Sequence, residues 1–328
     1  MSWGNCMEIK TYNKIDDLKS IWNEIYKKSK QCPILEFDFV KNWNKTLKQK
    51  KALILKRGKI KYYVGIENGK AIMILPMIKY GNTLESVYLL DYFDVLSEEN
   101  IEPEKVKEFI NKLSETTACK ILFNHVNENS VIANTFKEAI KKDKFEECSV
   151  ILLNPSSSQK FDEFYNKLSK NTRQNIRTMY NRISKDGIEF SLLEIDKSNY
   201  KKHQKTLKKL YVERRKNRYK NIGFILRTLY KHKEPILDTL SKLDFFKGYA
   251  IQINGKIVSY LAGTEKDGVL YVPRLVIGGE YSRYSTGILL LCEIIKNSSL
   301  KYIDLSTGSE DYKHSLNCVV HNNYFIEL

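Results

Sequence analysis

The first half of the chain alternates between helix-like and strand-like patterns of apolar residues. Residues 15–28 carry apolar side chains three or four positions apart, from Ile15 through Trp22 to Ile25, which predicts a helix. The same reasoning predicts further helices at residues 37–47, 103–114 and 130–141. Short apolar or alternating runs predict strands at residues 52–55, 61–66, 71–79, 86–90, 120–124 and 149–153.

The second half has longer helical segments and its own set of strands. Helices are predicted at residues 161–168, 169–185, 199–217, 224–243 (interrupted at Pro235) and 287–296. Strands are predicted at residues 188–193, 248–253, 256–263, 269–277 and 302–305. Gly187 follows the second of these helices and is expected to end it in a left-handed conformation. The mixture predicts an α/β (α+β) fold with mixed, mostly antiparallel sheets flanked by helices.

One pattern occurs twice in the same frame. YVGIENGK begins at Tyr63 and YAIQINGK at Tyr249, and each Asn-Gly pair predicts a hairpin with a type I′ turn. Helices precede each hairpin and strands and a helix follow, which favours a duplicated architecture, although two unrelated copies of a common hairpin would look the same. The Pro-Ser-rich residues 155–158 mark the expected boundary, between an N-terminal unit at 1–154 and a C-terminal unit at 155–328.

Composition is that of a globular protein with a local surplus of positive charge. Of the net +16, residues 167–220 supply +12, from 17 Lys/Arg against 5 Asp/Glu. This segment suits an anionic partner, although lysine is also an ordinary surface residue. No apolar run approaches the roughly 18 residues of a membrane span, so we expect no membrane span and a cytoplasmic protein. The six scattered cysteines are expected to be reduced thiols.

Small and hydroxylated residues open the most apolar predicted helix. Ser285, Thr286 and Gly287 stand at its start. A helix N-terminus has unpaired N–H groups and a partial positive charge, so it suits a phosphate group. A plain N-cap without a ligand is the alternative.

The loop after the last predicted strand contains several groups that can move protons. Asp304 and Glu310 are candidate bases, and Tyr312 and Lys313 lie beside them. Partial burial would raise the pKa of Asp304, but this carboxylate could instead fix the loop by accepting backbone N–H groups. Lys313 is expected to pair with Asp304 or to bind an anionic substrate. His314 is an alternative base or a plain surface residue.

These motifs resemble the GNAT acyltransferase superfamily, in the cellulose-biosynthesis-type branch related to the FemAB transferases. That branch has a small-Pro-Gly helix start, an Asp on a strand and then Gly-x-x-x-Tyr-Lys. The corresponding residues here are Ser285-Thr286-Gly287, with Thr in place of Pro, then Asp304, then Gly308 to Lys313. Arg283 matches the start of the general GNAT signature, whereas Thr286 and Ile288 replace its glycines.

The resemblance spans nearly the whole chain. It includes Asp91-Tyr92-x-Asp94 in the first half and Leu168-Ser169-x-x-x-Arg173 in the second. It implies two tandem GNAT-like units, with the donor site in the C-terminal one. Acetyl-CoA or another acyl-CoA would bind as co-substrate at Arg283, Ser285, Thr286 and Gly287.

The resemblance also implies a reaction. Backbone N–H groups of the strand at 271–277 would stabilise the oxyanion, Asp304 or Glu310 would act as the base, and Tyr312 would protonate the leaving sulfur. The expected activity is N-acylation of a small-molecule amine, and the resemblance implies that this amine belongs to a sugar or nucleotide-sugar of surface polysaccharide synthesis. An acyl carrier protein could replace CoA as the donor.

Two groups of arginines are candidates for binding the acceptor. Arg173 and Arg177 lie four residues apart and share a helix face, so they could hold a phosphate or carboxylate, and the resemblance marks Arg173. Arg214, Arg215 and Arg218 form a second group. A solvated helix face is the alternative for each.

The sequence allows two other functions and gives no indication of a metal site. A FemAB-like transferase using aminoacyl-tRNA would suit the basic segment, but no heptad run predicts the coiled-coil arm that such proteins often carry. A degenerate transferase that binds an anionic polymer is the non-enzymatic alternative. No metal site is expected, because His314 and Cys318 lack a second pair of ligands.

Overall fold

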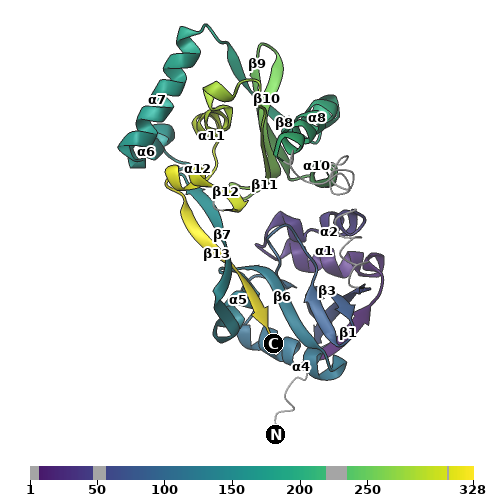
Figure 1. Cartoon of the computed structure of the whole chain (residues 1–328). Coiled ribbons are helices and arrows are strands. Elements are labelled where there is room, and N and C mark those ends of the chain that lie inside the picture. Colours follow the sequence, from purple (N-terminus) through teal and green to yellow (C-terminus); the bar gives the residue numbers. More distant parts are fainter. Residues whose placement is uncertain (1–6, 47–56, 219–234, 309) are drawn as a thin grey trace. The chain divides into compact units, whose positions relative to one another are not determined.

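The chain forms two compact units in the computed structural model, which describes residues 7–46, 57–218, 235–308 and 310–328 (Figure 1). Unit 1 comprises Met1–Cys148 and His321–Leu328, and unit 2 comprises Ser149–Val320. The predicted strand at 52–55 and the first part of the predicted helix at 224–243 lie outside the described residues.

Unit 1 is a mixed sheet with helices packed on it, in the strand order β1-β2-β3-β4-β6-β13-β7. Its strands are β1 (Glu8–Tyr12), β2 (Lys59–Glu67), β3 (Lys70–Tyr80), β4 (Thr83–Ser86), β5 (Leu96–Ser97, beside β3), β6 (Lys120–Asn127), β7 (Ile140–Leu152) and β13 (Val319–Glu327). Its helices are η1 (Ile15–Leu18), α1 (Lys19–Lys27), η2 (Pro33–Leu35), α2 (Phe37–Trp43), α4 (Pro103–Thr117), α5 (Val131–Thr135) and η3 (Lys137–Ala139).

Unit 2 has its own sheet, in the strand order β12-β11-β10-β9-β8 with β7 beside β12. Its strands are β8 (Phe190–Asp196), β9 (Phe246–Ile253), β10 (Lys256–Lys266), β11 (Val269–Ile277) and β12 (Tyr302–Thr307). Its helices are α6 (Lys160–Lys167), α7 (Lys170–Lys185), α8 (Tyr200–Arg218), α10 (Pro235–Leu240), η4 (Ser282–Tyr284), α11 (Thr286–Asn297) and α12 (Asp311–Ser315). Helix α11 lies on one face of this sheet with α6 and α7, and α8 and α10 lie on the other (Figure 1).

Helix α11 is the centre of the unit 2 core. It is apolar on nearly all sides because it is enclosed on nearly all sides, and Leu289, Leu290 and Ile294 are fully buried. Each such side chain stabilises the fold by about 1.5–3 kcal/mol through burial. The same apolar run that predicted a helix therefore also predicted a buried one.

The two units repeat one arrangement of strands. The β2–β3 and β9–β10 hairpins turn at Asn68-Gly69 and Asn254-Gly255, and all four turn residues have the positive φ of a type I′ turn. In each unit a third antiparallel strand and a helix follow. The next strand then returns parallel to the third, over three paired positions in each case. The predicted duplicated fold is confirmed.

The boundaries of the two units differ from the predicted ones. The first boundary falls at Cys148/Ser149, inside β7, rather than at 154/155. The last eight residues, His321–Leu328, belong to unit 1 and not to the C-terminal unit. They do so because β13 pairs with β6, with Asn323 opposite Asn127 and Glu327 opposite Leu122.

One predicted helix is wrong and two strands were not predicted, for a common reason. The predicted helix at 130–141 is only α5, followed by η3 and then by β7 from Ile140 onward. Strands β1 and β13 have no predicted counterpart. Short apolar runs fit either a helix or a strand, and pairing with partners far away in the sequence decides between them.

Candidate functional site

Strand β11 has an open edge in the middle of the unit 2 sheet. It pairs with β12 only from Val269 to Tyr271, whereas it runs on to Ile277. The N–H of Gly278 donates to Val258 O (2.8 Å), which turns that residue toward β10. Because hydrogen-bonding positions alternate along an antiparallel pair, the amides of Leu275 and Ile277 point to the opposite, open edge.

A β-bulge bends β11 beside this edge. Ala262 pairs with Arg274 and Thr264 with Tyr271, so β11 contains one extra residue at Val272-Pro273. Pro273 has no N–H to donate, which suits a position that the ladder leaves unpaired. Gly263 lies opposite the bulge, and a Cβ there would come closer than 3.0 Å to the Tyr271 carbonyl. The bulge separates the paired start of β11 from its open end.

Helix α11 begins just after β11 and contains residues that were predicted to form the phosphate cradle. Ser285 is exposed and has φ +47°, and its side chain makes no capping hydrogen bond. Thr286 is fully buried, and its carbonyl accepts a hydrogen bond from the Ser259 hydroxyl (2.9 Å). A Cβ on Gly287 would collide with Ile277, so this glycine allows α11 to pack on β11. Of the three predicted cradle residues, only Ser285 presents its side chain to solvent.

Cationic side chains surround a hollow of about 450 Å³ beside this helix start. Arg283 is exposed, pairs with Asp186 and lies 4.8 Å from the centre of the Tyr284 ring. Arg182 donates to the Arg283 carbonyl (2.5 Å), and Lys185 completes the rim. Hydrogen bonds from Tyr284 and then Arg283 lower the pKa of Asp186.

Arg182 and Lys185 were missed in the sequence-based selection. Both residues lie in the last turn of α7, which the sequence predicts as a helix. That prediction does not show that the end of α7 lies next to Arg283. The two are brought together by the packing of α7 against η4. The hollow therefore combines one predicted cation with two that only the tertiary structure reveals.

Asp304 and Lys313 hold the loop that follows β12. Asp304 is buried and accepts the N–H of Ser306 (2.8 Å), which has φ +60°. Lys313 is 2% exposed and donates to the carbonyls of Ser306, Thr307 and Gly308 at 3.0–3.2 Å.

The predicted roles of Lys313 need correction. Its ion-pair partner is Glu310 (3.1 Å) rather than Asp304. A buried ammonium group must have its protons accepted, and here loop carbonyls accept them. Lys313 therefore stabilises the loop and is not exposed to a substrate.

Tyr312, the predicted proton donor, is partly buried. It lies in the first turn of α12 and packs against the unit 2 core. Burial, and then the charge of Glu310, raise its pKa, while Arg214 lowers it. The hydroxyl is therefore protonated at neutral pH. Glu310 is largely exposed at the start of the same helix, and His314 is exposed one turn along.

Some of the predicted arginines bind other parts of the protein, and others are exposed and could bind a ligand. Arg173 donates to Leu168 O (2.6 Å) and Asn166 O (3.2 Å), so it caps the end of α6. Arg177 is exposed and has no hydrogen-bonding or ionic partner among the described residues. Arg214 reaches the open part of β11, with its guanidinium 3.5 Å from Leu275 O. Arg215 donates to the Tyr211 hydroxyl (2.6 Å), and the side chain of Arg218 lies outside the described residues.

The equivalent position in unit 1 is differently built. Strand β4 ends at Ser86, and Leu90 and Asp91 then take positive φ values. Phe93 forms a parallel bridge with Val126 of β6 and is buried. This crossing segment occupies the place beside β6 that corresponds to the open edge of β11, so unit 1 has no such open edge among its described residues.

One side-chain group could hold a metal ion within the part of the chain that the structure describes. Ligand atoms of Asp91, His125 and Glu146 lie within 4.8 Å of one another, in unit 1. His125 Nδ1 is 3.1 Å from Glu146 Oε2 and 3.6 Å from Asp91 Oδ1, which is also the geometry of an ion pair. Across residues 7–46, 57–218, 235–308 and 310–328, no helix has the length and apolar character required to cross a bilayer.

Comparison with known proteins identifies the type of domain. Residues 170–314 match the family model described as "Acetyltransferase (GNAT) domain". This segment contains β11, α11, the hollow beside it and α12. A search of the curated proteins found no match.

Solved structures share the fold along nearly the entire chain. A conserved protein of unknown function from Bacteroides thetaiotaomicron has a TM-score of 0.59 and 14% identity, covering 98% of this chain and 100% of that one. The C-terminal domain of a putative lysylphosphatidylglycerol synthetase from Agrobacterium fabrum has a TM-score of 0.58 and 10% identity, covering 96% and 92%. FemX has a TM-score of 0.54 and 8% identity, covering 98% and 96%. At these identities the likeness concerns the fold, which is shared along nearly the whole chain, while the match to the acetyltransferase domain covers residues 170–314 and indicates an acyltransferase.

Proposed function

We propose that the protein is an acyl-CoA-dependent N-acyltransferase whose donor binds in unit 2. The observation that carries this proposal is the open edge of β11, which leads directly to the start of α11 inside the segment that matches the GNAT domain. An extended pantetheine arm is itself amide-rich, so it can add to an open strand edge through backbone hydrogen bonds.

Each part of a thioester has a matching group in this arrangement. The outward amides of Leu275 and Ile277 would donate to the pantetheine arm and to the oxyanion that forms at the thioester carbonyl. The N-terminus of α11, with Ser285, would receive the pyrophosphate, and Arg182, Lys185 and Arg283 would balance its charge.

Proton transfer is assigned to the loop after β12. Tyr312 would donate its proton to the departing thiolate, because its hydroxyl is protonated at neutral pH. Glu310 would take a proton from the acceptor amine. Asp304 and Lys313 would act indirectly, by fixing the loop that carries both groups.

The acceptor and the setting belong to the proposal as well. We assign the amine to an amino sugar or nucleotide-sugar of surface polysaccharide synthesis, following the resemblance to the cellulose-biosynthesis-type branch. A cytoplasmic location agrees with the free thiols of Cys119, Cys148 and Cys292, which are buried. An acyl carrier protein remains a possible donor in place of CoA, since the cationic rim suits either.

A thermal-shift titration with acetyl-CoA, longer acyl-CoAs, free CoA and an RNA control tests the donor. A ligand that binds only the folded state raises the unfolding temperature in a saturable way, and we expect this with acyl-CoA. Arg182→Ala/Arg283→Ala should weaken acyl-CoA binding about 10-fold or more, because both guanidinium groups would pair with the pyrophosphate. Arg177→Ala is the matched control on α7. Failure of every CoA compound to shift the transition would remove the proposed donor.

A FemAB-like transferase that uses aminoacyl-tRNA is the second candidate. Two observations favour it: the fold likeness to FemX, and the cations around Tyr211, where Arg215 and Arg274 lie 5.4 and 4.8 Å from the ring centre. This candidate predicts tRNA binding that falls steeply with salt and aminoacyl transfer without CoA. A degenerate fold that binds an anionic polymer predicts the same salt dependence without any transfer.

A further inference from the structure

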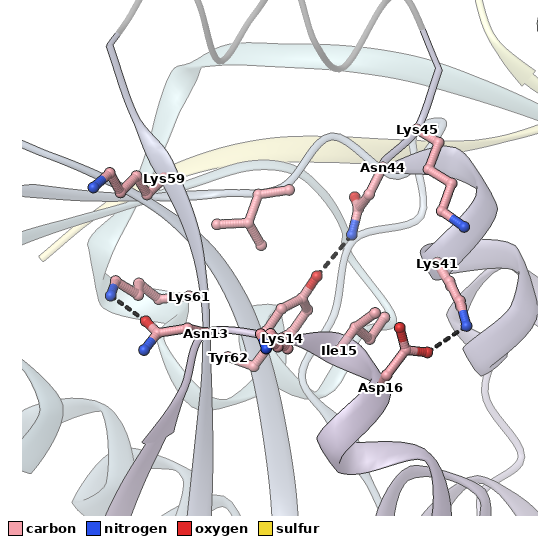
Figure 2. A pocket seen from close by; sticks show the side chains of 11 residues that line it. Asn13, Lys14, Ile15, Asp16, Lys41, Asn44, Lys45, Lys59, Lys61 and Tyr62 are labelled. Carbon is pink, nitrogen blue, oxygen red and sulfur yellow. Dashed lines mark hydrogen bonds and ion pairs between the residues drawn. The ribbon is translucent and has the colours of Figure 1, made fainter.

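Unit 1 contains a lysine-lined pocket that the proposed reaction does not use. It has a volume of about 710 Å³ and lies where α2 ends and β2 begins. Figure 2 shows Lys41 and Lys45 on one side, at and just after the end of α2, and Lys59 and Lys61 on the other, from β2. Lys14 adds a fifth ammonium group.

The charge of this pocket is poorly balanced. Five lysines against one acidic lining residue, Asp16, leave a net charge of +4. Asp16 is committed to Lys41, whose hydrogen bond is the largest cause of its lowered pKa. Lys61 donates to the Asn13 side chain. Lys14, Lys45 and Lys59 have no hydrogen-bonding or ion-pairing partner among the described residues.

The floor of the pocket is apolar and fixed. Tyr62 is 4% exposed, and its hydroxyl accepts a hydrogen bond from Asn44 Nδ2 (2.9 Å), as Figure 2 shows. Burial raises the pKa of Tyr62 to about 12, so the ring stays neutral. The side chains of Ile15 and Ile60 line the pocket beside it. The pocket thus pairs an uncharged floor with a cationic rim.

We infer that this pocket binds a small phosphate-bearing ligand of the nucleoside diphosphate class. The ammonium groups around the pocket come from different elements and repel one another, and an anion with many acceptor oxygens relieves this repulsion. The volume lies in the range of about 300–1,000 Å³ that is typical of small-molecule sites. The apolar floor offers a surface for the nucleoside. The inference concerns unit 1 alone and does not depend on the identity of the donor in unit 2.

Calorimetric titration of the full chain with ADP and UDP, inorganic pyrophosphate and adenosine tests this site. We expect both nucleotides to bind, pyrophosphate to bind more weakly and adenosine not to bind. Lys45→Ala/Lys59→Ala should weaken ADP binding at least 10-fold, and because both side chains are exposed the fold should be kept. Lys107→Ala/Lys137→Ala, which removes two exposed lysines of unit 1 elsewhere, should leave it unchanged.

The same titrations in an Arg182→Ala/Arg283→Ala background separate this pocket from the hollow in unit 2. ADP binding that persists in this background and is lost with Lys45 and Lys59 supports the inference. Binding that is lost with Arg182 and Arg283 but insensitive to Lys45 and Lys59 overturns it. Binding of an RNA oligomer through these lysines, with no binding of mononucleotides, also overturns it in favour of a polymer surface.

Discussion

Asp94 is a buried carboxylate that organises part of unit 1. It accepts hydrogen bonds from the backbone N–H groups of Val95, Val131 and Ile132 at 2.9–3.1 Å and from Gln31 Nε2 at 3.1 Å. It therefore caps α5 from a distant loop. These donors favour the ionised form, but burial has the larger effect and raises its pKa to about 6.

Asp94 should make the stability of unit 1 depend on pH. A carboxyl pKa raised from 3.8 to about 6 stabilises the folded state below about pH 4, and this contribution is lost as the pH rises through about 6. The loss amounts to about 3 kcal/mol. Urea unfolding between pH 4.5 and 7.5 should show this slope in the wild type. Asp94→Asn should lose the slope while being less stable at low pH, and equal slopes in both proteins would refute the assignment.

Tyr312 should affect turnover much more than stability. Tyr312→Phe keeps the packed ring and removes the hydroxyl, so the fold should be unchanged while kcat falls about 100-fold and KM for the acyl donor changes little. Steady-state kinetics and thermal unfolding together measure both effects. Tyr302→Phe, at an exposed tyrosine of β12, is the control. A Tyr312→Phe enzyme with unchanged kcat would leave the leaving group to be protonated by another residue or by water.

At the scale of elements, the bulge in β11 requires a glycine, Gly263, on the neighbouring strand β10. The bulge brings the Tyr271 carbonyl against Gly263, where even a methyl group would collide with backbone. Backbone cannot move aside as a flexible side chain can, so the bulge or the β10–β11 ladder would have to give way.

Gly263→Ala should accordingly destabilise unit 2 by about 2 kcal/mol or more. It should also weaken acyl-donor binding, because the open edge of β11 would shift. Gly279→Ala is a matched control, since a Cβ at that position would meet nothing within 4 Å. It should change stability by less than about 0.5 kcal/mol. Chemical denaturation gives both values, and equal effects of the two substitutions would contradict the role given to the bulge.

Gly287 illustrates how packing changes the meaning of a substitution. From the sequence, Gly287→Glu tests the phosphate cradle. In the structure a Cβ at 287 would meet the end of the Ile277 side chain, so this side chain would have to move whether or not a phosphate binds there. Substitutions at the exposed Arg182 and Arg283 are the sharper test of donor binding.

At the scale of the whole molecule, the last strand of the chain completes the first unit. β13 pairs with β6 and carries the buried residues Asn323 and Ile326 into unit 1. The backbone of Leu328 exchanges two hydrogen bonds of 2.9 Å with Ile121. Unit 1 is thus completed by residues that follow unit 2 in the chain.

Removal of residues 321–328 should destabilise unit 1 and leave the edge of β6 unpaired and prone to aggregation. We expect its unfolding temperature to fall by roughly 10 °C, since each kcal/mol corresponds to about 2–4 °C in a domain of this size. Added peptide 319–328 should restore part of the loss. Replacing the exposed Val319 and Val320 by threonine is the control. Unchanged unfolding of the truncated chain would show that β13 is dispensable.

Sequence-based prediction succeeded where the signal was local. Asn68-Gly69 and Asn254-Gly255 specify their turns by backbone preference alone, and Gly187 takes the left-handed conformation expected after α7. It failed for residues 136–141, where η3 and the start of β7 replace the predicted helix, and for the role of Lys313, which donates to loop carbonyls. No local pattern indicates whether a polar side chain will be buried.

The sequence by itself determined the class of fold, the repeated hairpin and the apolar helix that opens with Ser-Thr-Gly, because these depend on periodicity and on the conformational limits of single residues. Only the tertiary structure decided which side chains meet. It placed Arg182 and Lys185 beside Arg283, turned Arg173 to the end of α6, and returned β13 to the first unit. It also placed lysines from the end of α2 and from β2 around one pocket. Contacts between residues far apart in the chain depend on how whole elements pack. The hydrophobic and polar pattern of one segment does not specify which other elements pack against it.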